Sequence, residues 1–402
     1  MDLEASREIF KLEVLIAAAG VVLLAVFSGW IIYLDKSGRK GWNGRFGEET
    51  LSGDAAVFEN RTKNDELENI KNTENKKGKR KNKPGLYKDP VDLKATYPVI
   101  EADGGIDFYP EHFMTCIGTW GFGSYSYMEE DAVNYMNGLN DLAQRMEGRA
   151  VVYNMPIPLS SSIKIPDAHW QALSSIRQGE AIDRILGLGS QKVMQVQIYN
   201  TLMAHREEYV YFRTDHHWTA RGAYYAYRHF CKRKGISPHS LKEYSRETAK
   251  GYIGYYGLMT QDADLLAHPD SVTIYHPLSR ATITTTKKAK DGGGTWQDDL
   301  VVQKTADYAG AFIHGDNAFS DIVNIDLKDG ESCVVIKDSF GNAFIPFLVD
   351  HYKHVYVADF RYCEKTIPQI VEEYGVDDII FSINITNLRN SSVVGQIVQM
   401  TR

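Results

Sequence analysis

The chain has 402 residues, of which 43% are hydrophobic and 24% are charged. These fractions are near the average of folded proteins and exclude a wholly disordered, collagen-like or polytopic membrane chain. With 45 basic against 52 acidic residues the formal net charge is -7, so the total charge does not support a nucleic-acid partner. The four cysteines form no CxxC pair and no metal-ligand spacing. We therefore expect a globular protein without a resident metal, cofactor or disulfide framework.

An uncharged apolar run of 21 residues, VLIAAAGVVLLAVFSGWIIYL, occupies residues 14–34. As a helix it would extend about 31 Å, which matches a bilayer core of roughly 30 Å. Trp30 and Tyr33 near its end are typical of a membrane interface. A cleaved signal peptide would have a shorter apolar region and a small-x-small site, so we predict an uncleaved single-pass anchor over residues 1–40. Basic residues flank both ends, and charge alone does not decide the orientation.

Residues 41–95 are poor in apolar side chains, and the stretch 71–83 (KNTENKKGKRKNK) is dominated by basic residues. Such a segment cannot bury enough apolar surface to offset its ordering entropy, which predicts a flexible charged stalk. Contact of the basic run with anionic lipid or anionic polymer is the alternative.

From about residue 96 onward, short apolar runs alternate with longer amphipathic patterns, as in an α/β sandwich with a largely parallel sheet. Apolar periodicity predicts helices over Met128–Met146 and Thr219–Lys234. The predicted strands are Ala150–Asn154, Val193–Ile198, Ser332–Lys337, His354–Ala358 and Asp378–Ile383.

The segment 245–307 interrupts this alternation, and we expect an insertion beside the main sheet. Within it, the TITTT run at 282–286 predicts β structure, whereas the glycine-rich stretch at 291–299 predicts a mobile turn.

Polar residues suited to acid–base chemistry gather in the segment TDHHWT, residues 214–219. Histidine takes and returns a proton near neutral pH, and a nearby carboxylate such as Asp215 can orient His217 and stabilise its imidazolium. The alternative is that Thr214 or Asp215 caps the following helix and the histidines are ordinary surface residues.

A second candidate is Ser339, which follows the apolar strand predicted over Ser332–Lys337 and precedes a helical pattern. Its hydroxyl would lie at the carboxyl end of a strand, the edge at which open α/β sheets bind ligands. Serine is also a common helix cap, so this arrangement alone is weak evidence for catalysis.

A third candidate is the turn His314-Gly315-Asp316-Asn317. A glycine NH and an asparagine amide are donor types that an oxyanion hole uses, so Gly315 and Asn317 are our oxyanion candidates. The same residues are common in turns for backbone reasons alone.

Two long motifs carry a resemblance to a known family. TDHHWT with the following RGAYYAY, and KDSFGNAFIPFL (337–348) with the following HVYVADFRY, resemble the DHHW protein family of bacteria. That family is similar to the SGNH-hydrolase-like domains of alginate O-acetyltransferases. The resemblance covers about residues 103–402, with GTWGFGS at 118–124 as a weaker match. It implies a three-layer α/β sandwich with a mainly parallel sheet over 96–402.

The resemblance also implies the roles of three residues: Ser339 as nucleophile, His217 as general base and Asp215 as its orienting acid. Substrate-binding candidates beside them are His216, Trp218, Asp338 and Asn342. The chain departs from a standard SGNH hydrolase because Lys337 stands where the Gly of the Gly-Asp-Ser block would be, and because the serine comes late in the chain.

The activity that the resemblance implies is O-acetyl transfer to a polysaccharide or cell-wall glycan outside the cytoplasmic membrane. In such systems a separate multi-pass membrane acyltransferase supplies the acetyl groups, and a single anchor with a stalk fits that arrangement. Water as acceptor would make the protein an acetylesterase. The alternatives are a non-catalytic glycan- or envelope-binding module on the same fold, and a metal site built from His216, His217, Asp215 and His314, although adjacent histidines rarely ligate one ion.

Overall fold

The computed structural model describes residues 89–402 except 93, 173–177 and 289–290, together with the backbone of four strands between residues 13 and 43. The chain divides into two compact units, residues 1–79 and 80–402.

The described part of the first unit is a four-stranded antiparallel sheet. Its strands, in sheet order, are β1 (Glu13–Ala17), β2 (Gly20–Phe27), β3 (Trp30–Leu34) and β4 (Lys40–Asn43). The membrane helix expected over 14–34 stays a prediction; the run is rich in Val, Ile and aromatic residues, which also favour strands. Among the described residues, no helix is both long enough and apolar enough to cross a bilayer.

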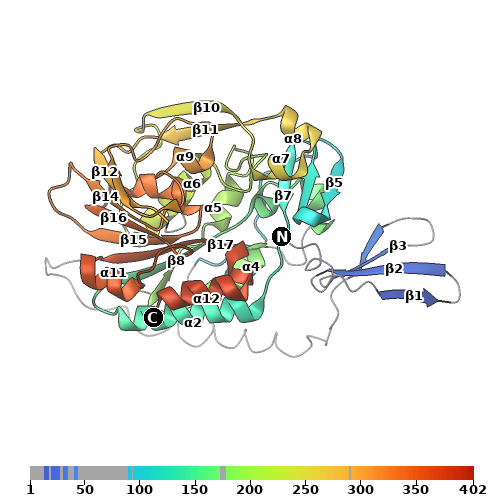
Figure 1. The fold of residues 1–402 in the computed structure, drawn as a ribbon, viewed down its shortest axis with the longest axis horizontal. Helices are drawn as coiled ribbons and strands as arrows, with labels where there is room; N and C mark the ends of the chain where they lie inside the picture. Colours follow the sequence, from blue (N-terminus) through green and yellow to red (C-terminus); the bar gives the residue numbers. More distant parts are fainter. Residues whose placement is uncertain are drawn as a thin grey trace. The chain divides into compact units, whose positions relative to one another are not determined.

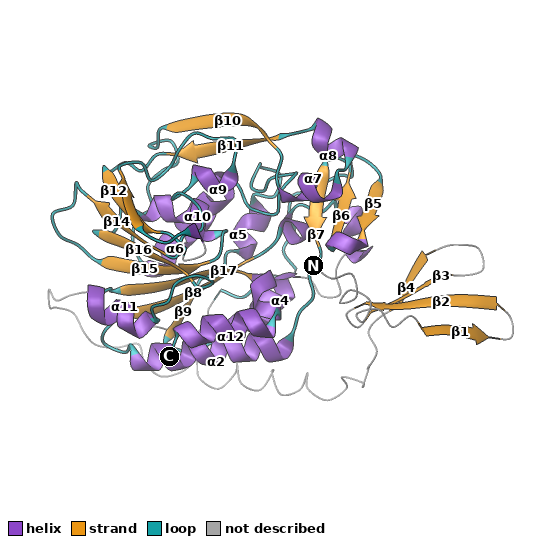
Figure 2. Ribbon diagram, in the orientation of Figure 1, coloured by secondary structure: helices purple, strands orange, loops and turns teal. Residues whose placement is uncertain are grey.

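An eight-stranded sheet forms the centre of the second unit (Figure 2). Strands β16, β15, β17, β8 and β9 are parallel, and β14, β12 and β13 extend one side in antiparallel pairing. In sheet order the strands are β13 (Thr295–Asp298), β12 (Ala281–Thr286), β14 (Phe319–Asn324), β16 (His354–Asp359), β15 (Ser332–Lys337), β17 (Asp378–Asn384), β8 (Val151–Ile157) and β9 (Val193–Gln195).

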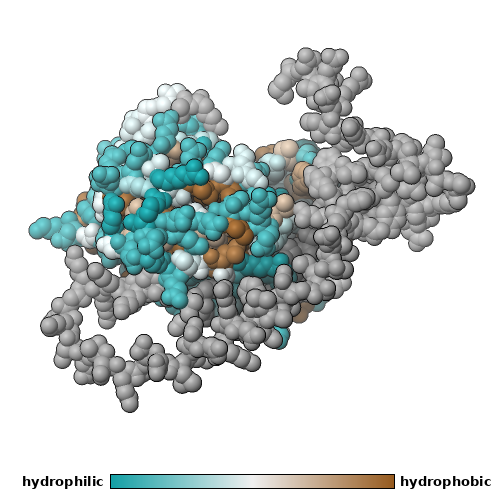
Figure 3. All heavy atoms as spheres, turned by 90° about the horizontal axis from the view of Figure 1, so that it is seen from below, coloured by the Kyte–Doolittle hydropathy of each residue, from teal (hydrophilic) through white to brown (hydrophobic). Residues whose placement is uncertain are grey.

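Helices cover both faces of this sheet and complete a three-layer sandwich (Figure 1). One face carries α2 (Glu129–Arg145), α4 (Gln178–Gly187), α11 (Ile367–Tyr374) and α12 (Ser391–Met400). The other carries α5 (Tyr199–Ala204), α6 (Ala220–Lys234), α9 (Tyr308–Ala311) and α10 (Gly341–Phe344). The described surface on the side of α2 and α12 is mainly hydrophilic around a smaller apolar area (Figure 3), as amphipathic helices require.

Successive side chains of the central strands point to opposite faces of the sheet and pack into two separate apolar cores. In β15, Val335 packs with the core under α6, whereas Val334 and Ile336 pack with the core under α2 and α12. All six residues of β15 are buried, which is why its sequence is almost continuously apolar.

Smaller elements lie around the sandwich. A three-stranded sheet contains β5 (Ile106–Tyr109), β6 (Met114–Ile117) and β7 (Trp120–Gly123), and a two-stranded sheet contains β10 (Arg246–Tyr252) and β11 (Asp270–Tyr275). The short helices are α3 (Ser160–Ile163), α7 (Tyr255–Thr260) and α8 (Ala263–Ala267). Short 3-10 helices are Pro110–His112, Asp167–Ala172, Ile345–Leu348 and Ile385–Arg389.

The central sheet confirms the predicted α/β fold with a largely parallel sheet, and the seven predicted strands and helices of the main fold are present within a few residues. The predicted insertion needs correction: β12 and β13 join the central sheet, because the TITTT run pairs with β14 on one side and β13 on the other. The glycine-rich turn accordingly ends at β13.

The predicted stalk, 41–95, lies largely outside the described residues, and its last part is not a linker. Val91 is buried in the core, and its NH donates to Asp183 Oδ1 at 3.2 Å. The folded unit therefore begins before residue 96. The four cysteines are free.

The ion pair between Lys234 and Asp378 joins α6 to the start of β17, and both side chains are buried. Replacing Lys234 with Met leaves the Asp378 carboxylate with the Tyr352 hydroxyl (2.6 Å) but without its buried cation. We expect the free energy of unfolding to fall by about 3–5 kcal/mol in urea titration. The control Lys192→Met removes an exposed pair with Glu147 and should cost at most about 1 kcal/mol. Equal losses in the two variants would contradict this assignment.

Candidate active site

The segment 211–219 forms a tight loop that is closed by a bridge between Tyr211 and Trp218. Asp270, at the start of β11, holds this loop from outside: its Oδ2 accepts hydrogen bonds from both the NH and the hydroxyl of Thr214, each at 2.7 Å. Thr219, not Thr214 or Asp215, caps α6, and its side chain accepts from the Gly222 NH. The capping alternative for Asp215 is therefore wrong, and this carboxylate is available for another role.

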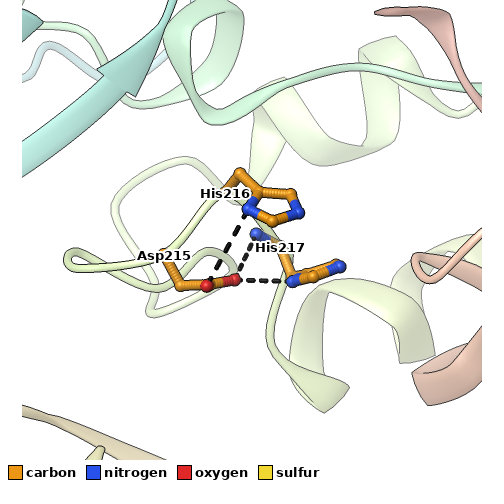
Figure 4. A group of neighbouring side chains, drawn as sticks. All are labelled: Asp215, His216 and His217. Carbon is orange, nitrogen blue, oxygen red and sulfur yellow. Dashed lines mark hydrogen bonds and ion pairs between the residues drawn. The ribbon is translucent and has the colours of Figure 1, made fainter. Parts of the chain in front are cut away.

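Three side chains from two distant parts of the sequence form a hydrogen-bonded chain. His217 Nδ1 lies 2.6 Å from Asp215 Oδ1, and His217 Nε2 lies 2.7 Å from Ser339 Oγ. Figure 4 shows the Asp215 side of this chain, with the carboxylate facing Nδ1. Asp215 and His217 are buried, whereas Ser339 is partly exposed. A carboxylate, an imidazole and a hydroxyl in this order have the geometry of a serine nucleophile with its base.

The surroundings of Asp215 keep it ionised. Burial alone would raise the pKa of this carboxyl, but the two imidazoles of His216 and His217 and the hydrogen bonds from His217 and the Tyr255 NH hold it well below its ordinary value. The Tyr255 NH donates to Asp215 Oδ2 at 2.8 Å, and the His217 NH donates to Oδ1 at 2.9 Å. A permanent negative charge beside His217 stabilises the imidazolium that forms when the ring takes a proton.

The turn that carries Ser339 is fixed to the loop by hydrogen bonds. The Trp218 indole donates to the Phe340 carbonyl at 2.8 Å, and the Tyr308 hydroxyl donates to the Ser339 carbonyl at 3.0 Å. The Tyr308 ring also stacks on the His217 ring, with 4.0 Å between centroids and 14° between planes. Trp218 and Tyr308 thus set the distance between base and nucleophile.

Lys337 ends β15 beneath this turn and is fully buried among acids. Its Nζ donates to Asp359 at 2.8 Å and to Asp316 at 2.7 Å. Burial would raise the pKa of Asp316, but Lys337 and Arg361 hold it well below its ordinary value. The Lys337 side chain also occupies the space over Gly341, where an added Cβ would lie 2.6 Å from Lys337 Cβ.

Three of the predicted substrate contacts are contradicted by burial. Trp218 and Asn342 are fully buried, and Asp338 is 2% exposed. The Asp338 carboxylate accepts from the NH groups of Phe340 and Asn384, so it shapes the turn. The fourth candidate, His216, keeps a side chain that is 32% exposed.

The predicted oxyanion donors are engaged elsewhere. The Gly315 NH donates to the Phe312 carbonyl at 2.9 Å, and Asn317 Nδ2 donates to the His314 carbonyl at 3.0 Å. Both groups stabilise their own turn, so the geometry does not favour the predicted oxyanion role. Within the described part of residues 89–402, the backbone NH of Ser339 donates to no acceptor. This NH belongs to the same residue as the nucleophilic hydroxyl.

Asp215, His216 and His217 place ligand-type atoms within 4.8 Å of one another. Both oxygens of Asp215 and both ring nitrogens of His217 are, however, already engaged in hydrogen bonds. The cluster therefore fits proton transfer better than it fits metal binding.

Sequence analysis did not identify Tyr308, Asp270 or Gly254 as parts of the site. Gly254 precedes α7, and an added Cβ there would overlap Asp215 Cβ and Oδ2. An isolated Tyr, Asp or Gly gives no sequence signal, because each role depends on a contact that only the fold creates.

Replacing Gly254 with Ala should displace the Asp215 carboxylate. The extra methyl group overpacks a buried contact, so we expect the free energy of unfolding to fall by about 1–3 kcal/mol in urea titration. Gly395→Ala is the matched control, because α12 leaves open space there and the change should be neutral or slightly stabilising. A Gly254→Ala variant as stable as the control would contradict the close contact.

His216 should make stability depend on pH. Burial and the neighbouring His217 lower the pKa of His216 from 6.5 to about 4. Between these pH values the unfolded chain binds the proton that the folded chain excludes, so stability is fully present above pH 6.5 and is lost as the pH falls toward 4. Denaturant titrations should show a shallower loss over this range for His216→Phe than for the unchanged protein; parallel curves would contradict the prediction.

Comparison with known proteins agrees with the fold and the motifs. The family model described as "DHHW protein" matches residues 112–358. The crystal structure of a DHHW family protein from Eubacterium siraeum is 27% identical, covers 74% of this chain and 98% of its own, and gives a TM-score of 0.64.

Two further structures are similar to this chain at lower identity, and the first of them shares the fold. Bacillus cereus PatB1 with a sulfonyl adduct is 20% identical, covers 70% of this chain and 97% of its own, and gives a TM-score of 0.57. The O-acetyltransferase domain of Pseudomonas putida AlgJ is 11% identical, covers 70% of this chain and 96% of its own, and gives a TM-score of 0.40. Among curated proteins no relative matches the chain. The family match over more than half of its length shows that the chain belongs to the DHHW protein family.

Proposed function

We propose that the protein is a serine O-acyltransferase or acylesterase that acts on glycan esters through Ser339, His217 and Asp215. The observation that carries the proposal is the continuous hydrogen-bonded chain from Asp215 Oδ1 through His217 to Ser339 Oγ. A partly exposed hydroxyl at the end of such a chain is the arrangement that nucleophilic catalysis requires.

The mechanism is a double displacement. His217 Nε2 takes the Ser339 proton as Oγ forms a bond with the acetyl carbonyl carbon of the donor ester. The tetrahedral intermediate then expels the donor alcohol, which receives the proton from His217, and an acetyl-Ser339 ester remains. In the second half, an acceptor hydroxyl gives its proton to His217 and attacks this ester. Release of Ser339, which recovers the proton, leaves the acceptor acetylated.

The negative charge on the carbonyl oxygen needs donors. The free Ser339 NH, at a turn leading into α10, is the donor we assign to it. Loss of one such donor typically lowers the rate by about 10²–10³-fold.

Acetyl transfer to a glycan is faster than hydrolysis only if the glycan hydroxyl is positioned better than water. The proximity effect in well-oriented systems reaches about 7–11 kcal/mol, enough for a bound sugar to outcompete solvent. The exposed Tyr255 ring, 47% accessible beside His216, offers a surface on which a sugar ring could stack.

We also propose that the domain works on the outer side of the cytoplasmic membrane, on a polysaccharide or cell-wall glycan, with acetyl groups supplied by a multi-pass membrane acyltransferase. The uncharged run at 14–34 supports a membrane location. Fractionation of cells that make the full chain, followed by protease treatment of intact spheroplasts, tests this location.

Ser339 should be labelled covalently by phenylmethanesulfonyl fluoride and should be acetylated by p-nitrophenyl acetate. Mass spectrometry of peptides should place each adduct on Ser339, and Ser339→Ala should lose both. Asp215→Asn should lower the rate of ester hydrolysis by about 10³–10⁴-fold, since the imidazole loses its orienting anion.

Ser392→Ala is the control, because Ser392 is exposed and lies in α12, outside the hydrogen-bonded chain. A folded protein in which Ser339 takes up neither reagent would contradict the catalytic proposal. If such a protein still bound glycan, the result would favour a non-catalytic glycan-binding module on the same fold.

A further inference from the structure

The second histidine of the motif has an arrangement that the proton relay does not use. The His216 ring lies against the His217 ring, with 3.9 Å between centroids, and contacts Tyr255 edge-on at 5.5 Å and Phe340 at 5.9 Å. Aromatic contacts on several sides fix the plane of this ring. A ring held in this way has a defined direction for each nitrogen.

The two nitrogens of His216 have different surroundings. Nδ1 is buried, has no hydrogen-bond partner, and lies 3.8 Å from Asp215 Oδ2. Since the side chain is 32% exposed, its exposed part lies among the other side-chain atoms. Figure 4 shows that both imidazoles turn Nδ1 toward Asp215 and Nε2 away from it, to the same side.

The carboxylate selects the tautomer of His216. A proton on Nδ1 is attracted by the Asp215 charge, whereas a lone pair there would be repelled by it. The ring is also neutral at ordinary pH, because burial and His217 lower the pKa of His216 to about 4. With the proton on Nδ1, Nε2 is a hydrogen-bond acceptor, and it points to the same side as His217 Nε2, the atom that contacts Ser339 Oγ.

From this arrangement, and on the basis of the proposed function, we propose that His216 Nε2 accepts a hydrogen bond from the hydroxyl next to the one that is acylated, so that the site selects acceptors with vicinal hydroxyls. The reacting hydroxyl donates to His217 Nε2 and gives up its proton there. The neighbouring hydroxyl keeps its proton and donates it to His216 Nε2. His216 is thus a positioning residue for a diol of a sugar ring, and Tyr255 forms the wall beside it.

Matched pairs of small acceptors test this role without knowledge of the natural glycan. The enzyme is acetylated with p-nitrophenyl acetate in the presence of either trans-cyclohexane-1,2-diol or trans-2-methoxycyclohexanol, which differ in the capped neighbouring hydroxyl. The measured quantity is the ratio of acetyl transfer to the two acceptors, each divided by hydrolysis in the same tube. One added hydrogen bond predicts a ratio of about two- to tenfold in favour of the diol after statistical correction.

Variants of His216 separate the hydrogen bond from packing. His216→Phe retains an aromatic ring without an acceptor, and His216→Asn does not extend an acceptor to the Nε2 position, so both should bring the ratio to about one. His216→Gln extends its amide oxygen toward that position and should restore part of the preference. His268→Phe, at an exposed histidine at the end of α8, is the control and should leave the ratio unchanged.

The outcomes distinguish this inference from the proposed function. A ratio near one in the unchanged enzyme, or a ratio that His216→Phe and His216→Asn leave intact, overturns the inference while acetyl-Ser339 still forms. If Ser339 of the unchanged enzyme is not acetylated at all, the proposed function fails and this inference fails with it. Should His216→Phe not fold, the comparison of Asn with Gln decides the question.

Discussion

The candidate site depends on one contact between two segments that are 122 residues apart in sequence, the hydrogen bond between His217 Nε2 and Ser339 Oγ. Neither segment sets that distance by itself. The Trp218 indole and the Tyr308 hydroxyl hold the serine turn through its carbonyl oxygens, and the stacked Tyr308 ring limits rotation of the imidazole. These buried groups form hydrogen bonds that cannot be replaced by water without moving the turn, which makes the nucleophile and base one rigid unit.

Charge is distributed on the two sides of Ser339 in different ways. On the side of the loop, the Asp215 carboxylate accepts hydrogen bonds from His217 and from backbone NH groups, so it acts on His217. On the side of the sheet, Asp316 and Asp359 are bound to Lys337 and Arg361. Pairing of these acids with permanent cations leaves Asp215 as the carboxylate that faces the base.

The sequence predicted most of the main sheet, because β15, β17 and their neighbours are buried on both faces and read as continuous apolar runs. It also predicted Asp215, His217 and Ser339, which lie in short motifs with recognisable chemistry. It misplaced β12, whose partner strand lies more than thirty residues away along the chain. It assigned Trp218, Asp338 and Asn342 to the substrate because polar or amphipathic residues near a nucleophile look alike in sequence, whereas burial is a property of the fold. Tyr308 and Asp270 act through packing and hydrogen bonds from remote elements, and no local pattern marks them.

Lys337 and Gly341 show how two positions of one motif constrain each other. The lysine stem fills the space that a side chain at 341 would need, and its ammonium group forms ion pairs with the buried Asp359 and the partly exposed Asp316. A smaller residue at 337 would free that space but leave Asp316 and Asp359 to share the Arg361 guanidinium, while a larger residue at 341 would displace the lysine. The length and charge of the residue at 337 are thus tied both to the absence of a side chain at 341 and to the acids at 316 and 359, so a change at one of these positions alters the environment of the others.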